Sequence, residues 1–486
     1  MRGLGSRYRR SVNSGALRRL VSVALVFGTG AAGVARAQSG PAPRPLSSLE
    51  SPPPAPVERP APLGEAEQPP EPVSATPAPA SPAPTSVLPE QPGDVPPAPV
   101  PPEAPLEPPA PPEEFSLTGL PALQIHAFVS QGAIKSTKNN YLIKHSTRGS
   151  FEFTEAAINF TQQLTDRLRM GLQLFTSQIG GVGDFRVEAD WYYLDYRFAD
   201  WLGLRAGRTK VPFGLYNEIN DIDAARVPIL LPQAVYPLLS RDLLLAQTGL
   251  ELYGYLRLQS AGGLEYRAYA GTLYAPPPAN TLTTTVTDFS VPYTYGGRLM
   301  WETPVEGLRI GGSYLGLRAD AAATITGADP TMSSTLAQRL VFRLWIASVE
   351  YARDDLLLAA EFSKWMGRLD NTAQSAAQGA VLSTTEETDT RYYGMAAYRI
   401  ARWLMPGAYY AGLYHHRKDL AGRGSHQHDI AATLRFDINS FWLVKIEGHY
   451  MLGNGDVAPA DLNDGKTADM LADRWFVFLA KTTAYF

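Results

Sequence analysis

Sixteen segments of about ten residues each, with alternating apolar and polar side chains, follow one another from residue 122 to the end of this chain. In residues 247–258 (QTGLELYGYLRL) the leucines share one parity, and the charged and tyrosine side chains share the other. Successive side chains of a β-strand point to opposite faces, so this period of two predicts strands with one apolar face. The predicted strands are 122–132, 151–163, 168–178, 185–198, 202–210, 247–258, 264–274, 292–302, 307–317, 339–352, 356–366, 389–400, 405–416, 427–438, 441–453 and 473–486.

The connections between these segments are of two kinds. Short turns, such as 165–166 and 439–440, alternate with long loops at 133–150, 211–246, 275–291, 318–338, 367–388 and 454–472. Outer-membrane β-barrels show this arrangement, with short turns in the periplasm and long loops outside. A sheet that crosses hydrocarbon must also close on itself, because unpaired edge groups cannot be hydrated there. We therefore predict an all-β fold in which residues 115–486 form a transmembrane antiparallel β-barrel of 16 strands, with both termini in the periplasm.

Some residues do not fit a strict alternation. In segment 339–352 the polar residues Arg343, Ser348 and Glu350 do not keep one parity, which predicts a β-bulge or a misplaced boundary. Aromatic side chains are expected on the outer face of a barrel, near both membrane interfaces. Strict parity nevertheless turns three aromatic residues inward: Tyr196, Phe198 and Trp475.

The chain ends on an alternating run, RWFVFLAKTTAYF, whose last residue is Phe486. In the predicted fold this last strand pairs with the first strand and closes the ring. A C-terminal aromatic residue of this kind resembles the assembly signal of bacterial outer-membrane proteins. That resemblance implies recognition by the barrel assembly machinery, with Phe486 as the candidate assembly signal and outer-membrane lipids around the barrel.

The first 114 residues have a different composition. Residues 1–37 contain seven arginines, no acidic residue, an apolar stretch at 20–34 and an Ala-x-Ala site, which are the parts of a cleaved secretory signal; an uncleaved anchor is the alternative. Residues 38–114 hold 28 of the 41 prolines and cannot bury enough apolar area to fold. We expect a disordered linker there, either a passive spacer or a tether that contacts the cell wall or another periplasmic component.

Charge and cysteine content exclude several kinds of function. The residues after 114 include 34 basic and 36 acidic side chains, whereas a nucleic-acid-binding domain shows a basic surplus or patch. The chain has no cysteine, so disulfides and thiolate metal sites are excluded. We expect no cofactor, no catalytic residue and no nucleic-acid partner.

The interior of a 16-stranded barrel is too wide for side chains to fill, so it holds an aqueous channel unless its loops close it. Function then depends on the charges that face the lumen and on the loop that narrows it. Parity places acidic and basic side chains there in similar numbers, which predicts weak charge selectivity; alternatively, they pair with each other and select nothing. The lumen-lining candidates are Arg205, Arg257, Arg267, Arg298, Arg309, Arg435, Lys445, Glu251 and Glu447.

The longest predicted connection, 211–246, begins within the run GRTKVPFGLYNE at 207–218. This run resembles that of phosphate-selective and related porins of Gram-negative bacteria, in which a Gly-Arg/Gln-x-Lys-x-Pro-Phe-Gly-type sequence leads into the third extracellular loop. The resemblance implies a trimeric, sixteen-stranded porin whose third loop folds into the barrel as its constriction. The matching positions are Lys210, Pro212, Gly214, Tyr216 and Glu218, and the candidate constriction charges further along the loop are Asp221, Asp223, Arg226, Arg241 and Asp242.

Two features of this loop limit what the resemblance implies. The chain lacks the clear run of basic residues of the phosphate-specific members, so a channel for general solutes is the better expectation. Pro212 and Gly214 also have a purely structural interpretation, since proline marks the end of a strand and glycine permits a sharp turn.

Histidines form one further group in the sequence. Two or three imidazoles on neighbouring strands of a hairpin could reach one metal ion, although exposed histidines more often contact only water, and we expect no metal site. The histidines that flank this outer hairpin loop are His415, His416, His426 and His428.

The predicted function is that of an outer-membrane porin, a water-filled channel for passive diffusion of small hydrophilic solutes or ions. We expect it to be a homotrimer, narrowed by the loop 211–246. A plugged barrel that serves as a surface anchor or adhesin is the first alternative. An outer-membrane hydrolase is the second, but His126 in the first strand has no recognisable Ser or Asn motif beside it.

Overall fold

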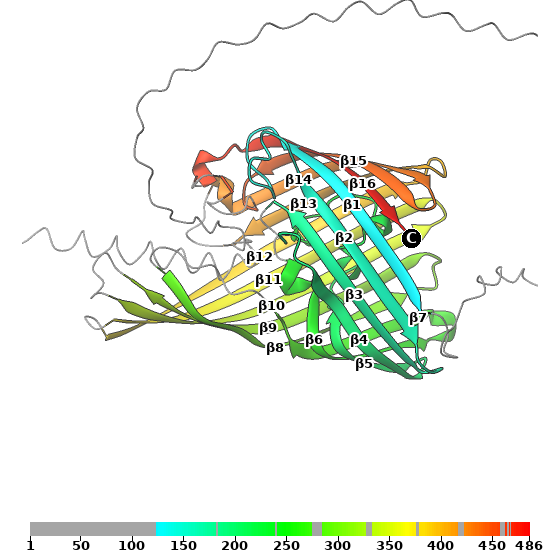
Figure 1. Cartoon of the computed structure of the whole chain (residues 1–486), viewed down its shortest axis with the longest axis horizontal. Helices are drawn as coiled ribbons and strands as arrows, with labels where there is room; N and C mark the ends of the chain where they lie inside the picture. The colour runs from blue at the N-terminus through cyan, green and yellow to red at the C-terminus, as the bar shows by residue number, and fades with distance from the viewer. Residues whose placement is uncertain are drawn as a thin grey trace, which may run out of the picture. The chain divides into compact units, whose positions relative to one another are not determined.

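The computed structural model describes residues 123–486, with gaps at 181–182, 239–240, 275–283, 327–332, 376–378, 417–421, 457–461, 464–465 and 467. The predicted signal peptide (1–37) and Pro-rich linker (38–114) lie outside the described residues, and so do parts of several predicted loops. Figure 1 shows the described chain as a ring of long, tilted strands.

The strands form one closed antiparallel barrel in which each strand pairs with its neighbours in sequence. β1 and β16 close the ring, with pairs from Phe128–Tyr485 to Ser136–Val477. The predicted 16-stranded β-barrel is therefore confirmed. The strands are β1 Gln124–Ser136, β2 Ser150–Gln163, β3 Leu168–Ile179, β4 Glu188–Ala199, β5 Leu202–Lys210, β6 Ala246–Arg257, β7 Gly263–Thr272, β8 Thr284–Glu302, β9 Leu308–Ile325, β10 Ser334–Arg353, β11 Leu356–Ser375, β12 Gly379–Tyr398, β13 Leu404–His415, β14 His426–Asn439, β15 Trp442–Gly453 and β16 Arg474–Tyr485.

Alternate residues of each strand face the interior and the outside. In β16, Trp475, Val477 and Lys481 are buried, whereas Phe476 and Phe478 are exposed on the outer surface. An outer face made of exposed apolar side chains is costly in water and suits a surrounding of hydrocarbon. The prediction that Trp475 points inward is therefore correct.

The strands β8 to β12 are longer than predicted. Figure 1 shows their ends running past those of the other strands on one side of the barrel. The predicted loops 275–291, 318–338 and 367–388 are therefore partly wrong, because these strands continue to Thr284, Ile325, Ser334, Ser375 and Gly379. In this extension charged side chains stand on the outer face, with Arg318 and Arg339 both paired to Asp320. Strands that are polar on the outside lack the apolar alternation from which the others were predicted.

The mixed parity in segment 339–352 comes neither from a bulge nor from the strand boundary, although β10 begins earlier than predicted, at Ser334. β10 pairs with β9 and with β11 without any shift of register. Ser348 and Glu350 face inward and are buried, while Arg343 faces outward. The parity of polar residues is mixed because Arg343 is a polar residue on the outer face. The inner face carries buried leucines beside Ser348 and Glu350, and these leucines pack against a loop inside the barrel.

A bulge lies instead in β4. The pairing of β3 with β4 shifts between Gln173 and Leu174, so that Asp190 is an extra residue in β4. The shift reverses the parity of the rest of this strand. Tyr196 and Phe198 consequently point outward and are exposed, contrary to the strict-parity prediction.

Helical structure in the described ranges is limited to single turns. No helix among them is long and apolar enough to cross a membrane. Three turns lie in the connection between β5 and β6. The turns are η2 Asn217–Ile219, η3 Asp223–Ala225, α2 Arg241–Leu244, η5 Gln259–Ala261, η6 Gly422–Ser425 and η7 Ala468–Met470.

Candidate functional site

The connection between β5 and β6, residues 211–245 and hereafter the inner loop, lies inside the barrel. Its base is closed by a hydrogen bond from the N–H of Val211 to the carbonyl of Leu245 (2.8 Å). Pro212 follows the end of β5, and Gly214 adopts a left-handed φ of 58°. A Cβ at Gly214 would lie 2.3 Å from the hydroxyl of Tyr236, so only glycine fits this turn. The structural interpretation of Pro212 and Gly214 therefore accounts for both residues.

Ionic contacts hold the inner loop to β3, β4 and the end of β5. The ammonium group of Lys210 pairs with the carboxylate of Asp221, which also accepts a hydrogen bond from the side-chain amide of Gln173 (2.6 Å). Arg241 pairs with Asp190 at 2.9 Å. Because Asp190 is the bulged residue of β4, the bulge positions a partner for the loop.

Glu218 joins the inner loop to β7 and β8. Its carboxylate pairs with Arg298 (2.8 Å) and with Arg267, and these two arginines also pair with Glu251 and Glu265, both at 2.7 Å. Burial by itself would raise the pKa of Glu218, but the guanidinium groups of Arg267 and Arg298 lower it to about 2. Glu218 therefore carries a full negative charge at neutral pH.

Asp223 anchors the middle of the loop to β15 and β16. Its carboxylate lies 3.1 Å from the ammonium group of Lys445 and 3.5 Å from that of Lys481, and it accepts a hydrogen bond from the hydroxyl of Thr483 (2.8 Å). Lys445 also donates to the backbone carbonyls of Asp223 (2.6 Å) and Arg226 (2.8 Å). Burial would raise the pKa of Asp223, but Lys445 and Lys481 hold it well below its usual range.

Glu447 of β15 holds the next part of the loop through the backbone. Its carboxylate accepts hydrogen bonds from the N–H groups of Ile229 (2.6 Å) and Leu230 (2.9 Å). The guanidinium of Arg226 donates to the carbonyl of Ile229, and that of Arg435 donates to the carbonyl of Ala224 (2.8 Å). These bonds use backbone groups of the loop, so they do not depend on which side chains residues 229 and 230 carry.

The opposite side of the inner loop packs against β9 to β13 through apolar side chains. At the centre, Phe213 and Tyr236 are buried with their ring centroids 6.1 Å apart. The carboxylate of Glu361 on β11 lies beneath them and accepts hydrogen bonds from the N–H of Leu215 (2.9 Å) and from the hydroxyl of Tyr236. The wall residues of this cluster include Leu315, Leu340, Leu344, Ile346, Trp365, Tyr393, Met395 and Leu413.

The structure places most of the lumen-lining candidates in or near these contacts. Arg205 pairs with Asp195 (3.2 Å), and its guanidinium lies 4.2 Å from the ring centroid of Tyr253. Arg309 pairs with Glu350 at 2.5 Å. Arg257 differs from the rest, because its side chain is 83% exposed at the rim, where it lies 3.7 Å from Asp200.

The constriction candidates are mostly buried. Asp221, Asp223 and Arg226 lie between the inner loop and the wall, whereas the Glu218 side chain keeps a 26% exposed fraction. The side chain of Asp242 lies outside the described part of the structure. Most of these charges therefore anchor the loop.

Several residues that hold the loop were missed by the sequence analysis. Tyr236, Tyr393 and Gln173 are neutral, and a search for charges on the inward parity does not find them. Asp195, which pairs with Arg205, escaped because the bulge in β4 reverses the parity that would have identified it.

The four histidines of the outer hairpin do not converge. His415 pairs with Asp389 at 2.7 Å and His416 lies 2.9 Å from the hydroxyl of Thr390. His426 and His428 are neighbours on the outer face of β14, with ring centroids 5.6 Å apart. In the described ranges no group of three or more His, Asp or Glu side chains is arranged to hold a metal ion.

Comparison with protein-family profiles found no match, and comparison with curated proteins found no relative. Solved structures with a similar fold include the loop-L8 deletion mutant of OmpT from Vibrio cholerae (10% identity, 75% of this chain and 99% of that chain, TM-score 0.46). A second is the outer-membrane channel DcaP of Acinetobacter baumannii (13% identity, 77% of this chain and 99% of that chain, TM-score 0.45). A third is an anion-selective porin from Comamonas acidovorans (11% identity, 75% of this chain and 99% of that chain, TM-score 0.44).

Proposed function

We propose that this chain is an outer-membrane porin, which lets small hydrophilic solutes pass through the space between the inner loop and the barrel wall. Membrane insertion is supported by the closed barrel with its exposed apolar outer face. Such a surface is stable in hydrocarbon, because a closed ring of strands leaves no sheet edge with unpaired backbone groups in the membrane. The short turns between the strands then face the periplasm together with both termini.

One observation carries the channel proposal. Charged side chains inside the barrel, close to the inner loop, keep contact with solvent: Arg205 is 20% exposed, Glu265 34% and Arg309 40%. A plug that filled the barrel would bury these groups, at a high cost in desolvation. Water therefore reaches the loop along the β5–β9 side of the wall, and the loop forms the constriction.

The solute is inferred from the pairing of these charges. Arg205, Arg267, Arg298 and Arg309 each have a carboxylate partner within 3.2 Å. Paired charges produce little net field, so the channel has weak charge selectivity and takes small solutes of either sign. A phosphate-specific site would need several unpaired cations directed at one point, and these four arginines do not supply it.

A closed barrel that serves as a surface anchor is the second candidate. The apolar cluster between the inner loop and β9–β13 favours it, because this half of the lumen is filled with buried side chains. The extension of β8–β12 past the other strands would then display a sheet at the cell surface.

Conductance in planar lipid bilayers distinguishes the two. The full chain should show discrete current steps that grow with salt concentration, and a reversal potential near zero in a salt gradient. Addition of polymers of increasing size should give a cut-off diameter well below that of the barrel. A protein that inserts into the bilayer but conducts no ions would support the anchor and remove the porin proposal.

A further inference from the structure

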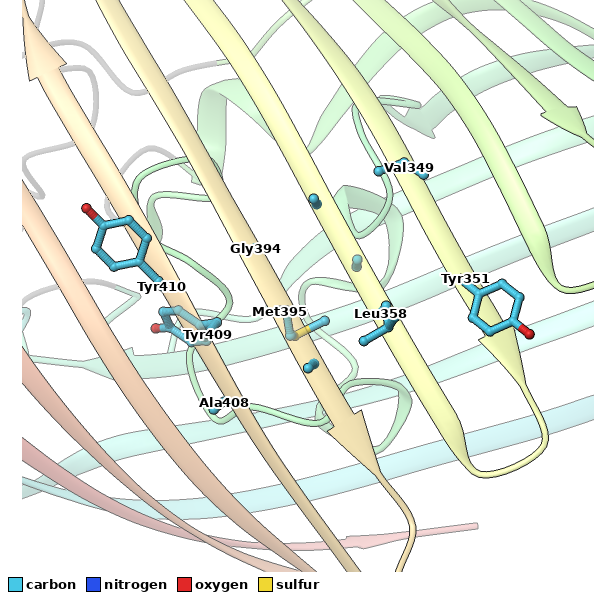
Figure 2. Close-up of a pocket in the computed structure, with 11 residues that line it drawn as sticks. Val349, Tyr351, Leu358, Gly394, Met395, Ala408, Tyr409 and Tyr410 are labelled. Atoms are coloured by element: carbon cyan, nitrogen blue, oxygen red, sulfur yellow. The ribbon is translucent and has the colours of Figure 1, made fainter.

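Aromatic side chains of this barrel lie in three different surroundings. Figure 2 shows two neighbours of β13, of which Tyr409 is buried in the cluster around the inner loop and Tyr410 is exposed on the outer face. A third group points inward but stays half-buried. It consists of Trp191 and Tyr193 of β4 and Tyr253 of β6, hereafter the aromatic strip.

The bulge in β4 directs two rings of the strip into the lumen. Asp190 faces inward and pairs with Arg241, and in a regular strand the next residue, Trp191, would face outward. Because Asp190 is an extra residue, Trp191 instead pairs in register with the buried Gln173, and Tyr193 follows on the same inner face. Bulges often redirect side chains beside functional sites.

Two glycines allow the rings of the strip to lie along the wall. A Cβ at Gly171 of β3 would lie 2.9 Å from the ring of Trp191 and 3.0 Å from that of Tyr193, and these two rings are stacked with centroids 5.4 Å apart. A Cβ at Gly203 of β5 would lie 2.3 Å from the ring of Tyr253. The rings therefore extend over neighbouring strands, and they present an apolar surface to a passing solute.

Charged groups of both signs border the strip. The guanidinium groups of Arg169 and Arg205 lie 5.8 and 5.6 Å from the ring centroid of Tyr193. Both pair with the carboxylate of Asp195, at 2.9 and 3.2 Å, and Arg205 also pairs with Glu251 at 3.1 Å. Two cations and two anions leave no net charge here. The Arg169 side chain is nevertheless 38% exposed, so N–H groups of its guanidinium reach the water of the lumen.

The strip also borders the inner loop. The side-chain amide of Gln173, the register partner of Trp191, donates to Asp221 of the loop at 2.6 Å. The register partner of Tyr253 is Arg267, which pairs with the loop at its other end. A solute that passes between the loop and this side of the wall therefore meets the aromatic strip.

We propose that the aromatic strip binds neutral sugars on their way through the channel, an inference that rests on the proposed porin function. A sugar ring has an apolar face of C–H groups, which packs against an aromatic ring, and hydroxyls at its edge that both donate and accept hydrogen bonds. The strip supplies the aromatic rings, and Arg169 supplies donors beside them. A charged solute gains little from a set of charges that is already balanced.

Ion current through single channels of the full chain in planar bilayers tests this, with maltotriose as the added sugar. The wild-type current should fall with sugar concentration and reach a plateau. Trp191→Ala should raise the half-saturating concentration about tenfold, the effect of losing one stacked ring, and Trp191→Phe, which keeps a ring, should raise it less than about threefold. Trp345→Ala is the matched control, since this tryptophan lies on the outer face of β10, and it should leave the half-saturating concentration unchanged.

Two other solutes separate binding from simple filling of the channel. Polyethylene glycol of the same hydrodynamic size has no sugar ring and should lower the current without saturation. Equal half-saturating concentrations in the wild type and Trp191→Ala would overturn the proposal. So would stronger block by nicotinamide, a neutral aromatic solute, which would identify aromatic compounds as the ligands. Ion steps that maltotriose does not change would remove the sugar site and leave the porin, whereas a lack of ion steps would remove both.

Discussion

The inner loop meets the barrel wall in two different ways. Toward β9–β13 its contacts are mainly apolar, with Phe213 and Tyr236 in a cluster of buried side chains that surrounds the carboxylate of Glu361. Toward β3–β8 and β14–β16 ion pairs are added, since Asp221, Asp223 and Glu218 each have cationic partners. A smaller apolar cluster there joins Ile229 and Leu230 of the loop to Trp475. Buried apolar area stabilises the loop almost regardless of its exact position, whereas a buried ion pair adds little net stability but is costly to break. The apolar half therefore supplies adhesion, and the ionic half fixes where the loop lies.

The largest effect is expected from breaking the ionic half at its most buried point. Lys445→Met leaves the carboxylate of Asp223 without its nearest cation. The effect should be large because the Lys445 and Asp223 side chains are both fully buried. The free energy of unfolding should fall by about 3–5 kcal/mol, measured by guanidinium titration in lipid vesicles. The double variant with Asp223→Asn also removes the carboxylate that has lost its nearest cation, and it should recover most of the loss. If the single and double variants were equally stable, the ionic half would not depend on charge pairing.

The apolar half should respond to volume and not to charge. Phe213→Ala removes a buried ring from the cluster and should lower the free energy of unfolding by about 3 kcal/mol, without changing its dependence on salt. Loosening of the loop should also enlarge the single-channel conductance. If the loss of stability in Phe213→Ala depended on ionic strength as strongly as the loss in Lys445→Met does, the apolar and ionic halves would not hold the loop by different forces.

Acid should weaken the ionic half through Glu218. Its pKa of about 2 lies below its ordinary value of 4.5, so its contribution to stability is fully present above pH 4.5 and is lost as the pH falls toward 2. The difference in thermal midpoint between the wild type and Glu218→Gln should therefore be constant from pH 7 to pH 5 and vanish near pH 2. A difference that disappeared near pH 6 would contradict the proposed pairing with Arg267 and Arg298.

Charge selectivity should change modestly when the exposed acid of the loop is removed. Glu218→Gln should raise the permeability of anions and lower that of cations by about two- to threefold each, the effect of one unit charge at about 7 Å in a water-like medium. The reversal potential in a salt gradient measures it. The control is Glu306→Gln, whose carboxylate is 77% exposed in the turn between β8 and β9 and should leave the potential unchanged. A similar shift in both variants would place the selective charge outside the inner loop.

The smallest effect is expected at the rim. Arg257→Gln removes a largely exposed arginine whose nearest carboxylate is 3.7 Å away. Such pairs contribute little, and the charge lies far from the loop, so neither stability nor reversal potential should change measurably. A change as large as that in Glu218→Gln would mean that the rim, and not the loop, controls passage.

The sequence was sufficient to predict all sixteen strands, because a wall with hydrocarbon on one side imposes a period of two. It was insufficient for the parts of β8–β12 that extend past the other strands, where the outer face carries Arg318, Asp320 and Arg339 in place of apolar side chains. A polar strand and a polar loop look alike in sequence.

For the candidate site, parity identified Lys445, and the resemblance of the loop to that of related porins pointed to Glu218 and Asp223, but neither showed which of them would meet. Pairing depends on the path of the loop across the lumen, and no local pattern encodes that path. The bulge at Asp190 shows the same limit, since one extra residue reverses the assignment of Tyr196 and Phe198.

The part of β8–β12 that extends past the other strands limits which insertions and deletions the chain can accept there. An irregular loop tolerates insertions of any length, but here the strands β9, β10 and β11 are paired on both sides, as Arg339 is with Asp320 and Asp370. A single added residue would turn every later side chain to the opposite face. Among homologous sequences, length differences within the strands β9, β10 and β11 should therefore come in steps of two, matched on both arms of a hairpin.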